Sequence, residues 1–313
     1  MQEAVFHEGE HVLQRRAGSF EQLARAGPRV IRDYMPDQHR AFFAQLPFIV
    51  AGTVDQDGQP WASVLAGPPG FITSPDPRLL HIAAAPLAHD PLQATLREGA
   101  AIGLLGIEPQ SRRRNRMNGL VRQPGPNGLR VTVNQSFGNC PKYIQGRRAE
   151  YTDSVRAAPV LHRTAALDDA GRALVADSDT FFIASAHPLA GRRAAPSFGV
   201  DVSHRGGRPG FVRIDDAGAL TVPDFVGNSY FNTLGNLAVN PCCGLLFIDY
   251  VDGDLLYLAC RAAILFDGPE LHAYRGAQRV LRLQPTAALR VERVLPMRWG
   301  PVEFSPFLAS TGP

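Results

Sequence analysis

Two short sequence matches show that the chain repeats itself, and this repetition constrains the fold more than any single residue does. The stretch PGFI at 69–72 returns as PGFV at 209–212, and GLLGIE at 103–108 returns as GLLFID at 244–249. Between these anchors both halves follow the same order, with a strand, a hairpin, a polar helix and a pair of strands. A chain of 313 residues is long enough for two such units. The sequence therefore predicts an internal duplication.

Short strands dominate each predicted copy. The stretch at 48–67 holds two strand-like runs around Asp57 and Gly58, which is a hairpin signal, and Asp252-Gly253 divides a similar pair in the second half. Many short strands with one short helix per copy favour small antiparallel barrels over alternating β-α units. The predicted fold class is mainly β (α+β), with two tandem barrels.

The predicted domain boundaries follow from where the two copies begin. Residues 1–45 contain helical patches closed by glycines and form an N-terminal helical extension. The first barrel covers 46–150 and the second covers 179–305. The stretch 151–178 between them is rich in Ala, Asp and Arg, and we interpret it as a linker.

Composition excludes several classes of protein. A net charge of +3 is too small to imply binding to nucleic acid or to a membrane surface. No run approaches 18 apolar residues, and the N-terminus lacks the apolar stretch of a signal peptide. The four cysteines have no C-x-x-C spacing, so no metal site is expected. A cytoplasmic setting without nucleic-acid or membrane partners is the expectation.

The two copies differ in their polar residues, which points to a single site. Arg208 and Arg213 of the second copy lie over Pro68 and Thr73 of the first. Two arginines followed by a polar helix start suit a dianionic phosphate. The alternative is a pair of solvated arginines followed by ordinary helix caps. The polar residues at the helix start are Asn228, Ser229, Asn232 and Thr233.

The first copy carries an arginine-rich strand instead. In SRRRNRMNG at 111–119, Arg112, Arg114 and Arg116 would share one strand face, with Arg113 on the opposite face. Three cations on one face need solvent or an anion. Because the second copy has no cations at these positions, we predict one site between the copies.

At these residues the sequence resembles the pyridoxamine 5′-phosphate oxidase-like, FMN-binding split-barrel superfamily. In those oxidases two basic residues separated by a few apolar ones bind the FMN phosphate, and RPGFVR at 208–213 has that spacing. The resemblance also places Arg113 and Arg114 over a pair that touches the flavin. Asn232 and Thr233 stand near positions where the oxidases have Arg-Lys, so the expected phosphate contacts differ in part.

The sequence more closely resembles a bacterial subgroup described as predicted flavin-nucleotide-binding proteins. The resemblance implies two tandem six-stranded antiparallel split barrels that form an intrachain pseudo-dimer, and it implies bound FMN. It runs through FHEGE at 6–10, PWASVLAGPPGFI at 60–72, RRRNRMNG at 112–119, FGNCPKYIQ at 137–145 and SHRGGRPGF at 203–211.

Three further residues complete the cofactor-binding candidates. Lys142 is the only lysine, and it lies near the flavin or a substrate anion, or else is a surface residue after a turn. Ser203 and His204 directly precede the expected phosphate contacts, where a histidine either relays protons or satisfies a local hydrogen bond. No catalytic residue is assigned. The full set is Arg208, Arg213, Asn228, Ser229, Asn232, Thr233, Arg113, Arg114, Arg116, Lys142, Ser203 and His204.

The expected function is that of an FMN-dependent oxidoreductase acting on a small molecule. A nicotinamide nucleotide or a separate reductase would supply electrons, and without a G-x-G-x-x-G fingerprint any nicotinamide would bind only transiently. A non-catalytic flavin-binding or sensing protein and a haem-handling protein are the alternatives. A homodimer of the whole chain also stays open.

Overall fold

The computed structural model describes residues 4–153, 158–192 and 195–312, and these residues form two similar antiparallel sheets. The first sheet contains β1 (Phe48–Val54), β2 (Pro60–Ala66), β3 (Ile72–Asp76), β4 (Leu79–Ile82), β5 (Ala101–Glu108), β6 (Arg113–Gly125) and β7 (Gly128–Gly138). The second contains β9 (Val160–Thr164), β10 (Thr180–Ala186), β11 (Val200–Gly206), β12 (Arg213–Ile214), β13 (Leu220–Phe225), β14 (Cys242–Ile248), β15 (Leu255–Leu265) and β16 (Ala277–Glu292).

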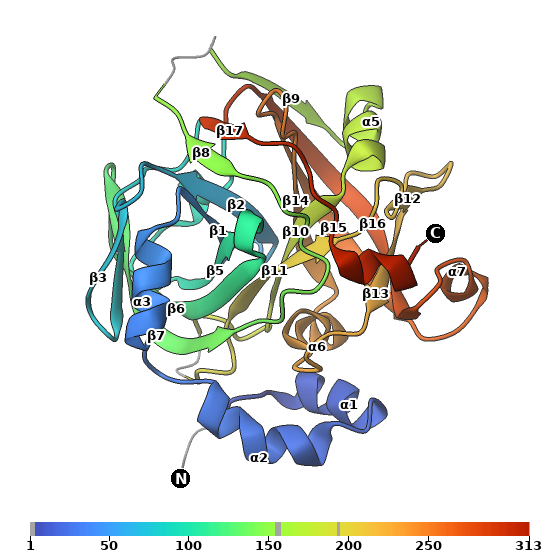
Figure 1. Ribbon diagram of the computed structural model, residues 1–313, viewed down its shortest axis with the longest axis horizontal. Helices are drawn as coiled ribbons and strands as arrows, with labels where there is room; N and C mark the ends of the chain where they lie inside the picture. The colour runs from blue at the N-terminus through green and yellow to red at the C-terminus, as the bar shows by residue number, and fades with distance from the viewer. Residues whose placement is uncertain (1–3, 154–157, 193–194, 313) are drawn as a thin grey trace.

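The strand order confirms the predicted duplication. The first sheet runs β2-β1-β5-β6-β7-β4-β3, and the second runs β11-β10-β14-β15-β16-β13-β12, with β9 pairing additionally with β16. Each path has seven strands rather than six, because the short strands β3 and β12 extend one edge. The fold is therefore a pair of tandem split barrels within one chain, seen side by side in Figure 1.

Each copy begins with a helix that the sequence interpretation did not assign to it. Helix α3 (Asp37–Ala44) precedes β1, and α5 (Asp169–Asp177) precedes β10. Gly70 N–H donates to Ala44 O and Gly210 N–H donates to Ala176 O, both at 2.9 Å. The repeated unit therefore starts at these helices. The stretch 151–178, apart from residues 154–157 outside the described part, contains α5, β9 and the end of β8 (Ala149–Tyr151).

The sequence analysis does not predict the long strand β16, whose strand pattern Pro285 interrupts. Pro285 lies opposite Cys260 of β15, next to a register shift at Ala259/Cys260. A proline has no N–H to donate to the ladder, and a bulge accommodates it. β16 joins β15 to β13, so it holds the second sheet together.

Two glycines let the copies pack closely against each other. A Cβ on Gly103 of β5 would lie 2.3 Å from Val200 O, and a Cβ on Gly244 of β14 would lie 2.3 Å from Pro60 O. Val200 and Pro60 are the first residues of β11 and β2, so the two contacts are equivalent. A core of buried side chains from both copies fills this junction, as expected for an intrachain pseudo-dimer.

Helix α1 (Glu8–Arg16) lies against the second copy, whereas α2 (Phe20–Val30) packs in a cluster that includes Phe137 of β7. Helix α1 crosses α6 (Asn232–Val239) where Gly9 meets Gly235, and a Cβ on Gly9 would lie 2.2 Å from Gly235 O. Figure 1 shows α1 and α2 below α6. The remaining elements are α4 (Leu92–Thr95), α7 (Pro269–His272), η1 (Pro109–Ser111), η2 (Pro306–Ser310) and β17 (Met297–Trp299). None of the helices described is both long and apolar enough to cross a membrane.

Candidate functional site

A cleft with a cavity of about 130 Å³ lies at the junction, with one wall from each copy. The first-copy wall comes from β6 and the segment after β7, and the second-copy wall comes from β11, β13, β16 and the start of α6. Nine of the twelve candidate residues line it. They are Arg114, Arg116, Lys142, Ser203, His204, Asn228, Ser229, Asn232 and Thr233.

Arg208 and Arg213 lie outside the cleft, although the strand does break between them as their spacing requires. β11 ends before Arg208 and β12 begins at Arg213, with Gly210 at φ +85° in the turn. That turn directs both side chains outward. The guanidinium of Arg208 lies 5.1 Å from the ring centre of Phe304, and that of Arg213 lies 4.5 Å from the ring centre of Tyr274.

The arginine-rich strand places two arginines in the cleft rather than three on one face. Arg113 points the other way, with its guanidinium 4.5 Å from the ring centre of Phe42. Arg112 precedes β6 at φ +53° and forms an ion pair with Glu303 at 2.8 Å. The alternation expected for a strand therefore starts one residue later, at Arg113.

Two cleft arginines are not among the site residues predicted from the sequence. Arg205 and Arg279 both form ion pairs with Asp224, the second at 3.3 Å. Arg205 is equivalent to Leu65 of the first copy. The next residues along, Gly206 and Ala66, both pair with the first residue of the neighbouring strand, which is Thr180 in β10 and Phe48 in β1. A full comparison of the copies could have found Arg205. Arg279 could not be placed in the same way, because it lies on β16, a strand that the sequence analysis does not predict.

A buried carboxylate orients Arg116. Asp201 accepts hydrogen bonds from Arg116 Nη1 at 2.9 Å, Asn118 Nδ2 at 2.8 Å and Asn236 Nδ2 at 2.9 Å. Arg116 Nη2 also donates to Ser203 Oγ. These contacts join both copies and fix the guanidinium at the cleft.

The cleft is strongly basic. Five cations line it, whereas Asp224 is the only carboxylate among the described lining residues. Burial is the main cause that lowers the pKa of Arg114, Arg116 and Arg279. A lowered arginine pKa means that the positive charge is poorly compensated, so an anion in the cleft would be stabilised. The five cations are Arg114, Arg116, Lys142, Arg205 and Arg279.

Several buried polar atoms of the cleft make no hydrogen bond within the protein. Four of the eleven buried side-chain N and O atoms without a hydrogen bond, in the described part of the chain, belong to cleft residues. Buried polar groups normally have partners, so these atoms point to a ligand or water. They are the Nε atoms of Arg116, Arg205 and Arg279 and the Oδ1 atom of Asn139.

Three cleft residues adopt strained backbone conformations. Tyr143, Ser229 and Phe231 have φ values of +65°, +60° and +64°. Left-handed conformations cost non-glycine residues about 1–3 kcal/mol each, and such residues gather at functional sites. His89, at the position of Ser229 in the first copy, also has a positive φ, so part of this geometry belongs to the duplicated fold.

His204 is neutral. Its ring is buried, with its centre 5.8 Å from that of Phe182. Burial, followed by the charges of Arg114 and Arg205, holds the pKa of His204 well below its usual range. A neutral imidazole can accept a hydrogen bond at one ring nitrogen and donate one from the other, but it adds no charge to the cleft.

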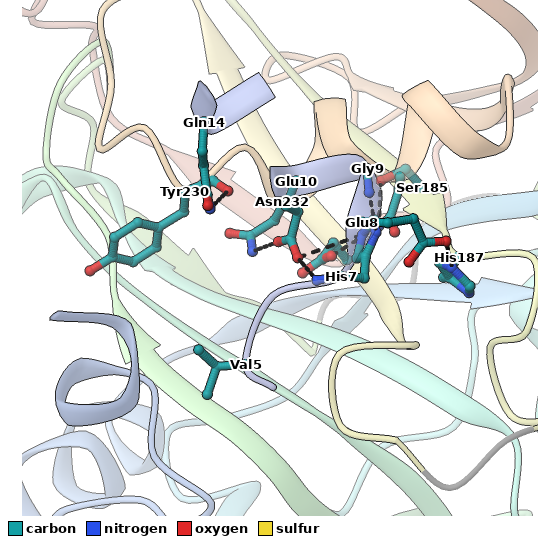
Figure 2. A network of polar contacts seen from close by, with 12 residues as sticks. Val5, His7, Glu8, Gly9, Glu10, Gln14, Ser185, His187, Tyr230 and Asn232 are labelled. Atoms are coloured by element: carbon teal, nitrogen blue, oxygen red, sulfur yellow. Dashed lines mark hydrogen bonds and ion pairs between the residues drawn. The ribbon is translucent and has the colours of Figure 1, made fainter. Parts of the chain in front are cut away.

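Helix α1 supports the second-copy wall from behind, as Figure 2 shows. Asn232 Nδ2 donates to Glu10 Oε1 at 2.6 Å, and His7 N–H donates to Glu10 Oε2 at 2.8 Å. Burial, followed by the charge of Asp201, raises the pKa of Glu10 well above its usual range. Glu10 therefore orients Asn232 at the start of α6.

His7, Glu8 and His187 place three ligand-type atoms within 4.8 Å of one another. Their hydrogen bonds do not suit a metal ion. Nδ1 of His7 accepts from Gly9 N–H and Nδ1 of His187 accepts from Leu189 N–H, each at 3.1 Å. In a neutral ring the proton then sits on Nε2, and Nε2 of His187 lies 3.1 Å from Glu8 Oε1. Metal-bound histidines usually donate from the second nitrogen, so the cluster is better described as a hydrogen-bond network.

The equivalent position on the other side of the junction is closed. Tyr257 Oη donates to Asp90 Oδ2 at 2.8 Å, and Ser63 Oγ donates to Asp90 Oδ1 at 2.6 Å. All three residues are buried. The duplicated fold therefore has one open cleft and one filled counterpart.

Residues 35–160, from just before α3 to the start of β9, match the family model described as pyridoxamine 5′-phosphate oxidase. A search of curated proteins found no match.

A comparison with solved structures matched proteins from three bacteria, among others. A tagged HupZ variant of Group A Streptococcus is 11% identical over 39% of this chain and 98% of its own, with a TM-score of 0.31. A protein assigned as a pyridoxamine 5′-phosphate oxidase from Lactobacillus delbrueckii is 17% identical over 34% and 95%, with a TM-score of 0.27. HutZ, a heme storage protein from Vibrio cholerae, is 15% identical over 41% and 96%, with a TM-score of 0.29.

Proposed function

Because the chain belongs to the pyridoxamine 5′-phosphate oxidase-like split-barrel family, we propose that its cleft binds FMN and that the protein is an FMN-dependent oxidoreductase acting on a small molecule. The observation that carries this proposal is the basic cleft between the copies. Five cations line this cleft together with a single carboxylate, and four of its buried polar atoms make no hydrogen bond within the protein. A phosphorylated ligand would supply the missing acceptors and negative charge.

The second-copy wall suits the phosphate. Arg205 and Arg279 share one carboxylate, so their combined charge is only half compensated. Ser229 offers a hydroxyl group just before α6, whose N-terminal end favours an anion. In this arrangement Arg205 and Arg279 take the role that the RPGFVR spacing predicts for Arg208 and Arg213.

The first-copy wall suits the polar edge of the ring system. Arg116 projects from β6 toward the second copy, and Asn139 offers an acceptor that receives no hydrogen bond within the protein. Bound FMN would supply the electron-accepting centre. The second-copy wall would hold the phosphate end of FMN, and the first-copy wall would hold its ring system. Electrons would come from a nicotinamide nucleotide or a separate reductase.

The absorption spectrum of the purified protein, with mass spectrometry of any released cofactor, tests this proposal. Flavin bands and released FMN are expected. A Soret band would instead assign the protein to haem handling, and absence of FMN binding after titration would refute the proposal. Reduction of the bound flavin by a nicotinamide nucleotide or a reductase, followed by reoxidation by a substrate, would separate an oxidoreductase from a flavin-binding or sensing protein.

A further inference from the structure

Two cations on the first-copy wall have no carboxylate partner. The other three cleft arginines each form an ion pair with Asp201 or Asp224. Arg114 and Lys142, in contrast, form no ion pair with any residue in the described ranges. Their charges are therefore available to a ligand.

The balance of charge in the cleft leaves room for a second anion. Five cations face two carboxylates, Asp201 and Asp224, so three positive charges remain. A phosphate monoester compensates about two of them. Glu10 lies outside this balance, because its oxygens accept hydrogen bonds from Asn232 and from the His7 N–H rather than from a cleft cation. About one positive charge is left over, which matches a carboxylate.

Arg114 is held in place without being neutralised. Its Nε donates to Cys140 O at 2.8 Å, and its Nη1 donates to His204 O at 3.4 Å. Carbonyl oxygens orient a guanidinium but carry no net charge. A guanidinium has five N–H groups, so donors remain for a ligand.

An aromatic surface lies beside these cations. The ring centre of Tyr143 is 5.2 Å from that of Phe225 and 6.5 Å from that of Phe307. Tyr143 Oη donates to Val226 O at 3.2 Å, which fixes the ring, and Lys142 Nζ lies 5.6 Å from the ring centre of Phe307. A cation beside a fixed aromatic ring suits a carboxylate attached to a flat apolar body.

We propose that the first-copy wall binds the carboxylate group of the substrate, with Lys142 and Arg114 as its cations and Tyr143 as its apolar surface. The substrate class is a small carboxylic acid with a planar or aromatic body. This assignment rests on the proposed function, because it assumes that a phosphate occupies the opposite wall.

The test compares benzoate with its neutral isostere benzamide. Each compound is titrated into the FMN-loaded protein, and binding is followed by the change in flavin absorption. Benzoate is expected to bind at least about tenfold more tightly, because only benzoate carries the charge. Lys142→Gln and Arg114→Gln should each weaken benzoate binding by about tenfold. Arg113→Gln, on the same strand but outside the cleft, should leave it unchanged.

Lys142 is the more secure test position, since it lies on the rim and its replacement leaves the core intact. Equal binding of benzoate and benzamide, no saturable benzoate binding, or an unchanged affinity in Lys142→Gln would overturn the proposal. If the protein takes up no FMN, the proposed function fails separately, and the same titrations are then followed by calorimetry on the FMN-free protein. In that case, loss of benzoate binding in Lys142→Gln supports the carboxylate subsite. Benzoate binding that depends on Arg205 and not on Lys142 refutes it.

Discussion

Arg116 and Tyr257 occupy equivalent positions in the two copies, yet one borders an open cleft and the other fills its counterpart. Each pairs across its sheet with the third residue of the repeated GLL motif, Leu105 for Arg116 and Leu246 for Tyr257. The Tyr257 hydroxyl reaches Asp90, whereas Arg116 is held back by Asp201. This difference in the repeated strand therefore contributes to the asymmetry between the two sides of the junction.

This asymmetry predicts one FMN per chain. On the filled side, Ser63, Asp90 and Tyr257 are buried and hydrogen-bonded to one another, so these polar groups are not available to a ligand. The flavin absorbance of saturated protein, divided by the protein concentration from amino-acid analysis, measures the ratio. A value near two would show that the Tyr257 side also opens.

Removing the phosphate-side cations should weaken FMN binding. Arg205→Ala and Arg279→Ala each remove a charge-assisted hydrogen bond worth about 1.5–3 kcal/mol, so the dissociation constant should rise by about ten- to a hundredfold. Fluorescence titration of FMN into the apoprotein measures this. Arg208→Ala and Arg213→Ala are matched controls from the same copy, since both side chains lie outside the cleft. If Arg208→Ala and Arg213→Ala instead raised the FMN dissociation constant more than Arg205→Ala and Arg279→Ala, the phosphate site would be the one that the RPGFVR spacing predicts.

Glu10 should act on the cleft through Asn232. Glu10→Ala removes the acceptor of Asn232 Nδ2, and the freed amide should raise the FMN dissociation constant by about tenfold. Glu10→Gln keeps a neutral acceptor at the same place and should have a smaller effect. Glu8→Ala, on the exposed side of the same helix, is the control. If Glu10→Ala lowers only the unfolding free energy and not FMN affinity, α1 is a structural support alone.

Asp90 should make stability depend on pH. Burial raises the pKa of Asp90 from 3.8 to about 6. Because the folded state holds this proton more tightly than the unfolded state, the contribution to stability is full below about pH 4 and is lost as the pH rises toward 6. The shift corresponds to about 3 kcal/mol of unfolding free energy.

Urea unfolding of the wild type and Asp90→Asn between about pH 4 and pH 7 measures this contribution. The wild type should lose stability across that window relative to the variant, which has no titrating group at this position. Parallel curves for the two proteins would mean that Asp90 is ionised in the fold, stabilised by its hydrogen bonds from Ser63 and Tyr257.

The sequence by itself determined the duplication, the antiparallel strands and most of the cleft. The PGF turns are equivalent in the structure, since Phe71 N–H donates to Pro68 O and Phe211 N–H donates to Arg208 O, both at 2.9 Å. Local patterns suffice for such features because turns and alternation depend on neighbouring residues. The strand parity of β6 likewise separated Arg114 from Arg113 correctly.

Only the tertiary structure decided which arginines meet in the cleft. Arg208 and Arg213 have a suggestive spacing, but the turn between them sends both side chains outward. Arg205 and Arg279 are far apart in sequence, and they meet because β13 brings Asp224 between them. Spacing along a chain sets the direction of a side chain only within one regular element. Across turns and between strands, the pairing of the sheet determines where a charge lies.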